Sequence, residues 1–175
     1  MVFEFGRYKV DIDVGKTRAF YETLETVSQL CSCDGCLNFE RSVGVLPRSV
    51  RGFFDELGID MRKVCECYVI YTKADGTLSY GGLCHVCGTL LEGESAWRKT
   101  GETTAEWNEA AVFPVSDGLR VSFQEEDIRM LEDGFPQPVL QIDFTLDVPW
   151  VLSKVNTYDR EGGKRRLRDL IFRRL

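Results

Sequence analysis

The chain has 175 residues, of which 43% are hydrophobic and 29% charged, and its formal net charge is −6 at pH 7. This composition is typical of a folded globular protein of one domain and argues against disorder of the whole chain. No apolar stretch approaches the roughly 20 residues that span a bilayer, and residues 1–13 lack the basic-then-apolar order of a signal peptide. The sequence therefore predicts a cytoplasmic protein without a membrane span, in which the cysteines stay reduced.

The distribution of charge divides the chain into an acidic body and a basic tail. Residues 154–175 contain 8 basic and 3 acidic side chains, which leaves 14 basic and 25 acidic ones in residues 1–153. The sequence therefore predicts a single domain over 1–153, with a net charge of −11, and a basic amphipathic tail over 154–175, with a net charge of +5. The acidic body argues against nucleic acid as a partner. The tail is instead predicted to dock on protein through Leu167, Leu170 and Ile171, in the same chain or in a neighbouring subunit of an oligomer.

The first third of the chain is predicted to be helical after a short strand region. Residues 2–5 and 7–13 alternate apolar and polar side chains, which indicates a strand or a short hairpin. Helices are predicted over residues 14–28, from Cys36 to Leu46, and from Pro47 to a stop before Gly58.

The middle of the chain carries a hairpin pattern. Residues 65–72 and 78–91 read as strands, and the dipeptide Asp75-Gly76 between them is a frequent hairpin turn. An antiparallel hairpin turning at this dipeptide is therefore predicted.

Two further strands are predicted over residues 119–124 and 138–148, whereas the polar segment 92–111 has no assignment. Helices that precede a series of strands favour an α+β fold. We expect the N-terminal helices to pack on a mainly antiparallel β-sheet.

Up to about Trp150, the chain contains in order the segments VDID, FYET, CSCDGCLNFE, LP, FFDELGID, YGGLCHVCG and LEDGFPQPVLQIDFTLDVPW. This order of segments resembles that of a group of small bacterial cytosolic proteins that have no assigned activity. The resemblance implies a bacterial protein of one domain and implies no chemistry. Cys84, Cys87 and the tail beyond Leu152 depart from this group.

The segment CSCDGC places Cys31, Cys33 and Cys36 within six residues. The chain has seven cysteines, and an odd number excludes a complete disulfide framework. Short Cys-x(n)-Cys spacings supply thiolate ligands to zinc, which prefers four ligands in a tetrahedron. Zinc bound by these three cysteines is therefore one interpretation of the segment, and it is the one cofactor that the sequence suggests.

A fourth zinc ligand would come from elsewhere, and the segment CHVCG offers Cys84, His85 and Cys87. The alternative is that these are ordinary residues of a strand, in which positions 84 and 87 point to opposite faces. Cys65 and Cys67 share one face of the preceding strand, where they are interpreted as sheet packing.

Thiol redox chemistry is a second interpretation of the Cys33/Cys36 pair. A cysteine near a helix N-terminus is acidified by the helix dipole, and Cys36 is expected at that position. Against this interpretation, a helix and not a strand precedes the motif, and the charge of Asp34 would raise the pKa of a neighbouring thiol.

Trp97, Trp107 and Trp150 lie in or beside polar segments. Large amphipathic rings are enriched at binding surfaces, although they also cap sheet faces. The sequence assigns no catalytic residue. It favours a binding module that recognises a protein partner or a small ligand through the sheet and residues 92–111.

Overall fold

Two long and largely buried strands form the centre of the sheet. In the computed structural model, which describes residues 1–159, β4 (Leu78–Glu92) pairs antiparallel with β9 (Val139–Val148). The strand order is β1-β2-β4-β9-β8-β7. The seventh strand, β3, also pairs with β4, along residues 78–83, whereas β2 pairs with residues 88–92. The remaining strands of this sheet are β1 (Val2–Phe5), β2 (Tyr8–Ile12), β3 (Glu66–Thr72), β7 (Phe113–Ser116) and β8 (Leu119–Gln124). All its pairings are antiparallel.

The hairpin β3–β4 confirms the prediction made for residues 65–91. Tyr68 faces Gly81 across the two strands. The turn forms where the sequence indicates, because Gly76 takes a positive φ of 88° and the Asp75 carboxylate accepts the Thr77 N–H at 2.9 Å. The segment 92–111 contains a second, separate hairpin that the sequence did not predict, with strands β5 (Trp97–Lys99) and β6 (Ala105–Trp107).

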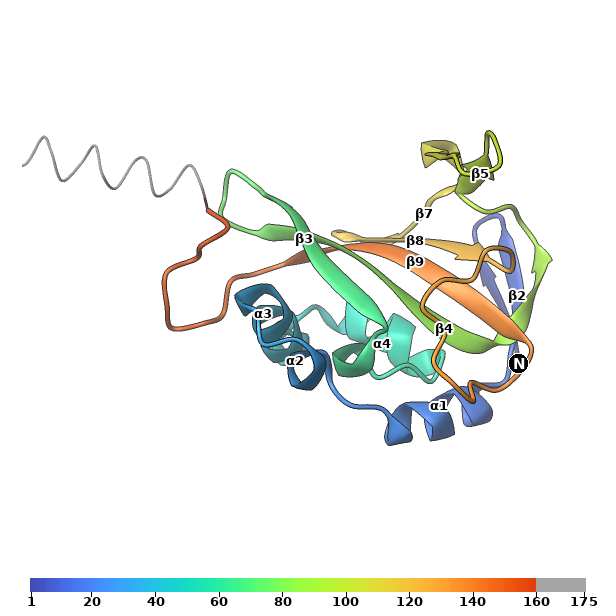
Figure 1. Ribbon diagram of the computed structural model, residues 1–175, viewed down its shortest axis with the longest axis horizontal. Helices are drawn as coiled ribbons and strands as arrows, with labels where there is room; N and C mark the ends of the chain where they lie inside the picture. The colour runs from blue at the N-terminus through green and yellow to red at the C-terminus, as the bar shows by residue number, and fades with distance from the viewer. Residues whose placement is uncertain (160–175) are drawn as a thin grey trace, which may run out of the picture.

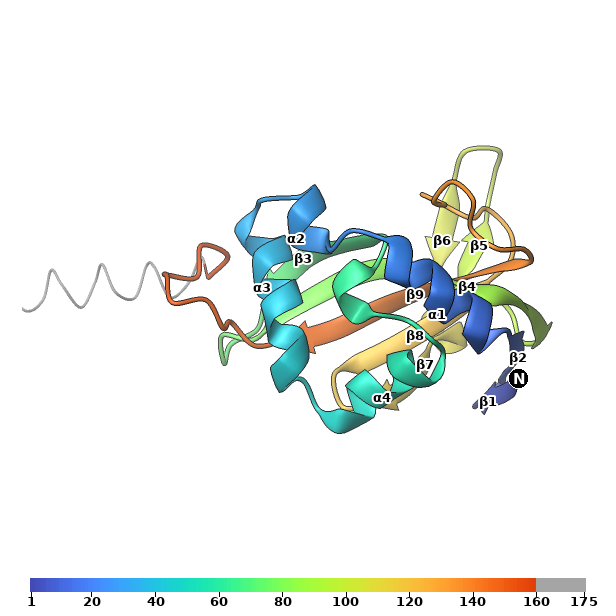
Figure 2. The same ribbon diagram turned by 90° about the horizontal axis from the view of Figure 1, so that it is seen from below.

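Four helices cover one face of the sheet, and the hairpin β5–β6 lies on the other side (Figures 1 and 2). The helices are α1 (Val14–Thr23), α2 (Val27–Leu30), α3 (Asp34–Ser42) and α4 (Arg48–Glu56). The α+β class with N-terminal helices on an antiparallel sheet is therefore confirmed.

The prediction of a single helix over residues 14–28 is wrong, because α1 ends at Thr23 and a second helix, α2, follows. Leu24 has extended backbone, and Thr26 begins a new helix in which the Gln29 side chain accepts the Thr26 N–H at 2.7 Å. The short α2 that results ends at the cysteine segment. This break therefore determines where the first cysteine lies.

Aromatic side chains fill the space between the helices and the sheet. Phe54 of α4 and Phe39 of α3 are fully buried, and their rings lie 5.7 Å and 6.3 Å from that of Phe144 in β9. Within residues 1–159, no helix combines the length and the apolar character that crossing a membrane requires.

The segment after β9, residues 149–159, returns along α3 and β3. Buried Asn38 in α3 donates to the Pro149 carbonyl at 3.1 Å and accepts the Val151 N–H at 2.8 Å. At its far end, Thr72 of β3 donates to the Tyr158 carbonyl at 2.8 Å. Residues 160–175, including the predicted apolar positions of the tail, lie outside the described part of the chain, so the docking of the tail stays a prediction.

Candidate metal centre

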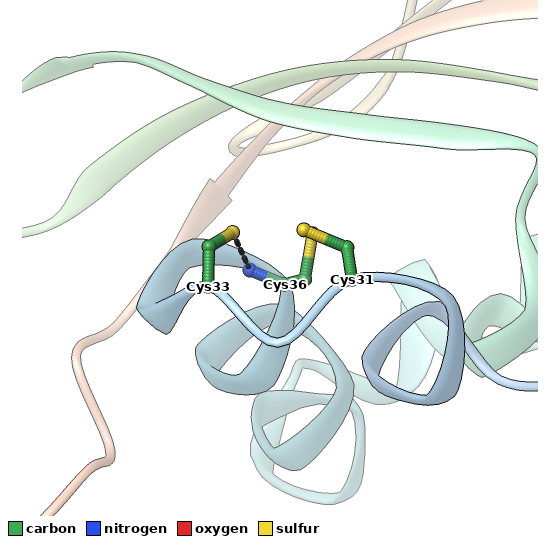
Figure 3. Close-up of side chains that lie close together, drawn as sticks. All are labelled: Cys31, Cys33 and Cys36. Atoms are coloured by element: carbon green, nitrogen blue, oxygen red, sulfur yellow. Dashed lines mark hydrogen bonds between the residues drawn. The ribbon is translucent and has the colours of Figure 1, made fainter.

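The three clustered cysteines lie where α2 ends and α3 begins. Cys31 is the C-cap of α2, Cys33 is the N-cap of α3, and Cys36 belongs to the first turn of α3. Their three sulfur atoms lie within 4.8 Å of one another (Figure 3). The prediction that these sulfurs gather in one loop between two helices is confirmed.

Local hydrogen bonds fix the start of α3. The Cys36 N–H donates to Cys33 Sγ at 3.4 Å, so that this sulfur replaces the oxygen of a usual N-cap residue (Figure 3). The Tyr80 hydroxyl donates to the Gly35 carbonyl at 2.9 Å from the sheet side. The Tyr158 hydroxyl also packs on Gly35, where it would lie 2.9 Å from an added Cβ. The loop is thus held between the sheet and the segment 149–159.

A fourth thiol reaches the cluster from β3. The Cys67 side chain is half-buried on the face of the strand that packs on the core, and it lies close enough to Cys36 to raise the pKa of that thiol. Its sulfur does not lie within 4.8 Å of all three others. Tetrahedral zinc with Zn–S bonds of about 2.3 Å needs all six sulfur–sulfur distances near 4 Å. Cys67 is therefore the fourth donor that α3 and β3 offer, and it would move closer to complete a tetrahedron.

The thiols of the cluster differ in acidity. Burial alone would raise the pKa of Cys33, but hydrogen bonds from the Cys36 N–H and from the Cys31 and Cys36 side chains outweigh it, so the pKa is lowered. Burial and the neighbouring Cys67 raise the pKa of Cys36. Burial raises the pKa of Cys67 to about 12. Cys36 lies in the first turn of α3, near the helix N-terminus as expected, but the thiol with the lowered pKa is Cys33, which occupies the N-cap.

Cys84, His85 and Cys87 lie in the middle of β4 and are all buried. The Cys84 thiol points to the Ile142 carbonyl at 3.9 Å, and the Cys87 thiol to the Gln137 carbonyl at 3.4 Å. None of the three belongs to the sulfur group at α3, so the structure does not bring the predicted fourth ligands to it. Burial lowers the pKa of His85, and its Nε2 has no hydrogen-bond partner among the described residues.

Comparisons of the chain with protein families, with curated proteins and with solved structures gave no significant match. The resemblance to small bacterial cytosolic proteins therefore stays a prediction.

The three tryptophans fall into two separate places. Trp97 and Trp107 face each other across β5 and β6, and their ring centroids lie 5.0 Å apart. Both remain more than a third exposed. Trp150 lies in the segment 149–159, where it donates to the Lys154 carbonyl at 2.8 Å and its ring centroid lies 6.4 Å from that of Tyr158. The two hairpin tryptophans form a surface that Trp150 does not share.

Proposed function

We propose that the protein is a cytosolic binding module in which zinc, held by Cys31, Cys33, Cys36 and Cys67, fastens the loop between α2 and α3 to β3. The observation that carries this proposal is the approach of three sulfurs to within 4.8 Å, with a fourth thiol beside them. Four thiolates make a closed zinc site, which has no open position for a substrate and serves structure. The metal would therefore position recognition surfaces and take no part in a reaction.

The surroundings of the loop support a structural role for the metal. Bound zinc would connect the end of α2, the start of α3 and strand β3, and the segment 149–159 already packs on this junction through Lys154, which pairs with Asp34, and through Tyr158. The only histidine, His85, lies buried in β4, so no imidazole in the chain is available beside the cysteines as a general base.

Elemental analysis tests the proposal. Protein purified without chelators is expected to contain one zinc per chain, and Cys36→Ser is expected to lose it, because a serine hydroxyl is a poor zinc ligand. Cobalt added to the metal-free protein should give the intense visible absorption of tetrahedral cobalt thiolate. Reduced protein that holds neither metal would contradict the proposal.

Thiol–disulfide exchange is the second candidate function, and the order of thiol acidities favours it. Cys33 is exposed and has a lowered pKa, whereas Cys36 is half-buried and has a raised one. In this scheme the Cys33 thiolate attacks a substrate disulfide and displaces one sulfur as a thiolate. Cys36 then loses its proton and attacks Cys33, which releases the second sulfur and leaves the substrate reduced and a Cys33–Cys36 disulfide.

Alkylation of the metal-free, reduced protein distinguishes the thiols. Because only the thiolate reacts, iodoacetamide is expected to modify Cys33 first, at a midpoint pH below that of an ordinary thiol near 8.5. Cys36 and Cys67 should stay unmodified at neutral pH, since burial raises their pKa. Peptide mass spectrometry after a pH series measures each site. Equal rates at Cys33 and Cys36 would contradict both the acidity order and the exchange scheme, and protection of all four cysteines by added zinc would favour the metal module.

A further inference from the structure

The sheet face opposite the helices carries a hollow bordered by aromatic rings. A pocket of about 140 Å³ is lined by Tyr68 from β3 and by Trp97 and Trp107 from the hairpin β5–β6. Gly81, which has no side chain, also lines this pocket. The Tyr68 ring lies so close to it that a Cβ at position 81 would be only 2.7 Å from the ring. Tyr68 itself is half exposed. The rings of these three residues therefore surround one small space.

A buried carboxylate lies at the bottom of this hollow. The Asp143 side chain in β9 is only 9% exposed, it lines the same pocket as Trp97, and it accepts hydrogen bonds from the Gln141 amide. Arg129 pairs with it at 2.6 Å, and the guanidinium carbon lies 5.5 Å from the Trp97 ring centroid. The hollow thus already holds one planar cation, the Arg129 guanidinium, which contacts both the Trp97 ring and the Asp143 carboxylate. The Arg129 side chain is also partly open to solvent, since it is 48% exposed.

An adjoining pocket of about 590 Å³ shares Trp97 and Arg129 with the hollow. Its wall contains more acidic than basic side chains: Glu94, Glu125, Glu126 and Asp127 against Lys99 and Arg129. Lys99 is paired with Asp127 at 2.8 Å, and Arg129 with Asp143. This excess of carboxylates disfavours an anionic ligand and attracts a cationic one.

We infer that these two joined pockets, the tryptophan cleft, bind the guanidinium of an arginine side chain presented by a protein partner. The rings of Trp97, Trp107 and Tyr68 would stack on the planar cation, and the carboxylates of the wall would accept its N–H groups, as Asp143 already does for one N–H group of Arg129. Arg129 competes for the same ring and carboxylate and swings towards solvent when the partner binds. The cleft lies on the face of the sheet opposite the cysteine loop, so this inference does not rest on the proposed metal.

Titration with a blocked Gly-Arg-Gly peptide, followed by the NMR signals of the indole N–H groups, tests the inference. The matching Gly-citrulline-Gly peptide has nearly the same shape without the charge. The full chain is expected to prefer the arginine peptide by about tenfold, with shifts at Trp97 and Trp107 and none at Trp150. Arg129→Ala, which removes the internal competitor, should bind the arginine peptide roughly tenfold more tightly than the unchanged chain. Trp97→Leu and Trp107→Leu, each made in that background, should abolish binding.

Equal binding of both peptides would overturn the inference, because shape and not charge would then be recognised. Binding by Arg129→Ala without any binding by the unchanged chain would also overturn it, since Arg129 would then be a permanent occupant. Each tryptophan variant is a control for the other. Both rings are partly exposed and neither belongs to the core, so neither replacement is expected to unfold the protein.

Discussion

Replacing Cys67 by serine is expected to lower the affinity of the proposed site for zinc by at least about 100-fold, whereas the same change at Cys65 is expected to leave it unaltered. The two residues form a matched pair, since they lie two positions apart and are both partly buried. The Cys67 side chain lies close enough to Cys36 to raise its pKa, but the Cys65 thiol donates to the Met130 carbonyl at 2.7 Å. Of the two thiols, Cys67 is therefore the one expected to supply the fourth thiolate.

This loss of affinity is expected to appear as a loss of stability, because a metal that binds only the folded chain stabilises it by mass action. A 100-fold weaker site removes up to about 2.7 kcal/mol at a fixed free zinc concentration, which corresponds to roughly 5–10 °C in melting temperature. Competition with a chromogenic chelator measures the affinity, and thermal unfolding with and without zinc measures the stability. Equal zinc affinity in the two variants would exclude Cys67 and leave a site of three cysteines.

Gly82→Ala is expected to destabilise the protein by about 3 kcal/mol or more. Gly82 lies in β4 between Cys67 of β3 and Phe144 of β9. A Cβ at this position would be 2.4 Å from the Glu66 carbonyl oxygen and 2.4 Å from the Phe144 ring. The ring could tilt, but the carbonyl belongs to the neighbouring strand, so β3 would be pushed away from β4.

The matched control is Gly52→Ala, in the middle of α4, where a Cβ meets no atom within 4 Å. Alanine is the better helix former, so this change should stabilise the protein by about 0.5–1 kcal/mol. Urea unfolding followed by circular dichroism compares the two variants. A cost below about 1 kcal/mol for Gly82→Ala would show that the strands yield easily and that the clash is relieved without separating them.

Much of the fold could be predicted because its signals are local. The hairpin at Asp75-Gly76 depends on a turn-forming dipeptide between two alternating segments, and the structure contains it. The hairpin β5–β6 escaped prediction because its strands have three residues each and contain no buried residue, so they carry no alternation of buried and exposed positions.

The cysteine site was only half predictable for a related reason. The close spacing of Cys31, Cys33 and Cys36 brings their sulfurs together through local chain geometry. Cys67 joins them only because α3 packs on β3, a tertiary contact that no short motif records. Alternation along β3 did place Cys67 and Tyr68 on opposite faces, but it could not indicate what lies above each face. The expected helix start at Cys36 differs by two residues from the start at Asp34, so the sequence did not indicate that Cys33 is the N-cap of α3.

The proposed zinc, shared by Cys36 and Cys67, would join two points that are roughly 30 residues apart along the chain, with α4 in the loop between them. A metal shared by these residues would act as a cross-link, which limits the conformational entropy of the unfolded chain. For a loop of that length a disulfide contributes about 3–5 kcal/mol by this route. A disulfide does not persist where thiols are kept reduced, whereas a thiolate-bound metal does. The chain would thus gain a cross-link that depends on the supply of metal and, unlike a disulfide, does not need oxidising surroundings.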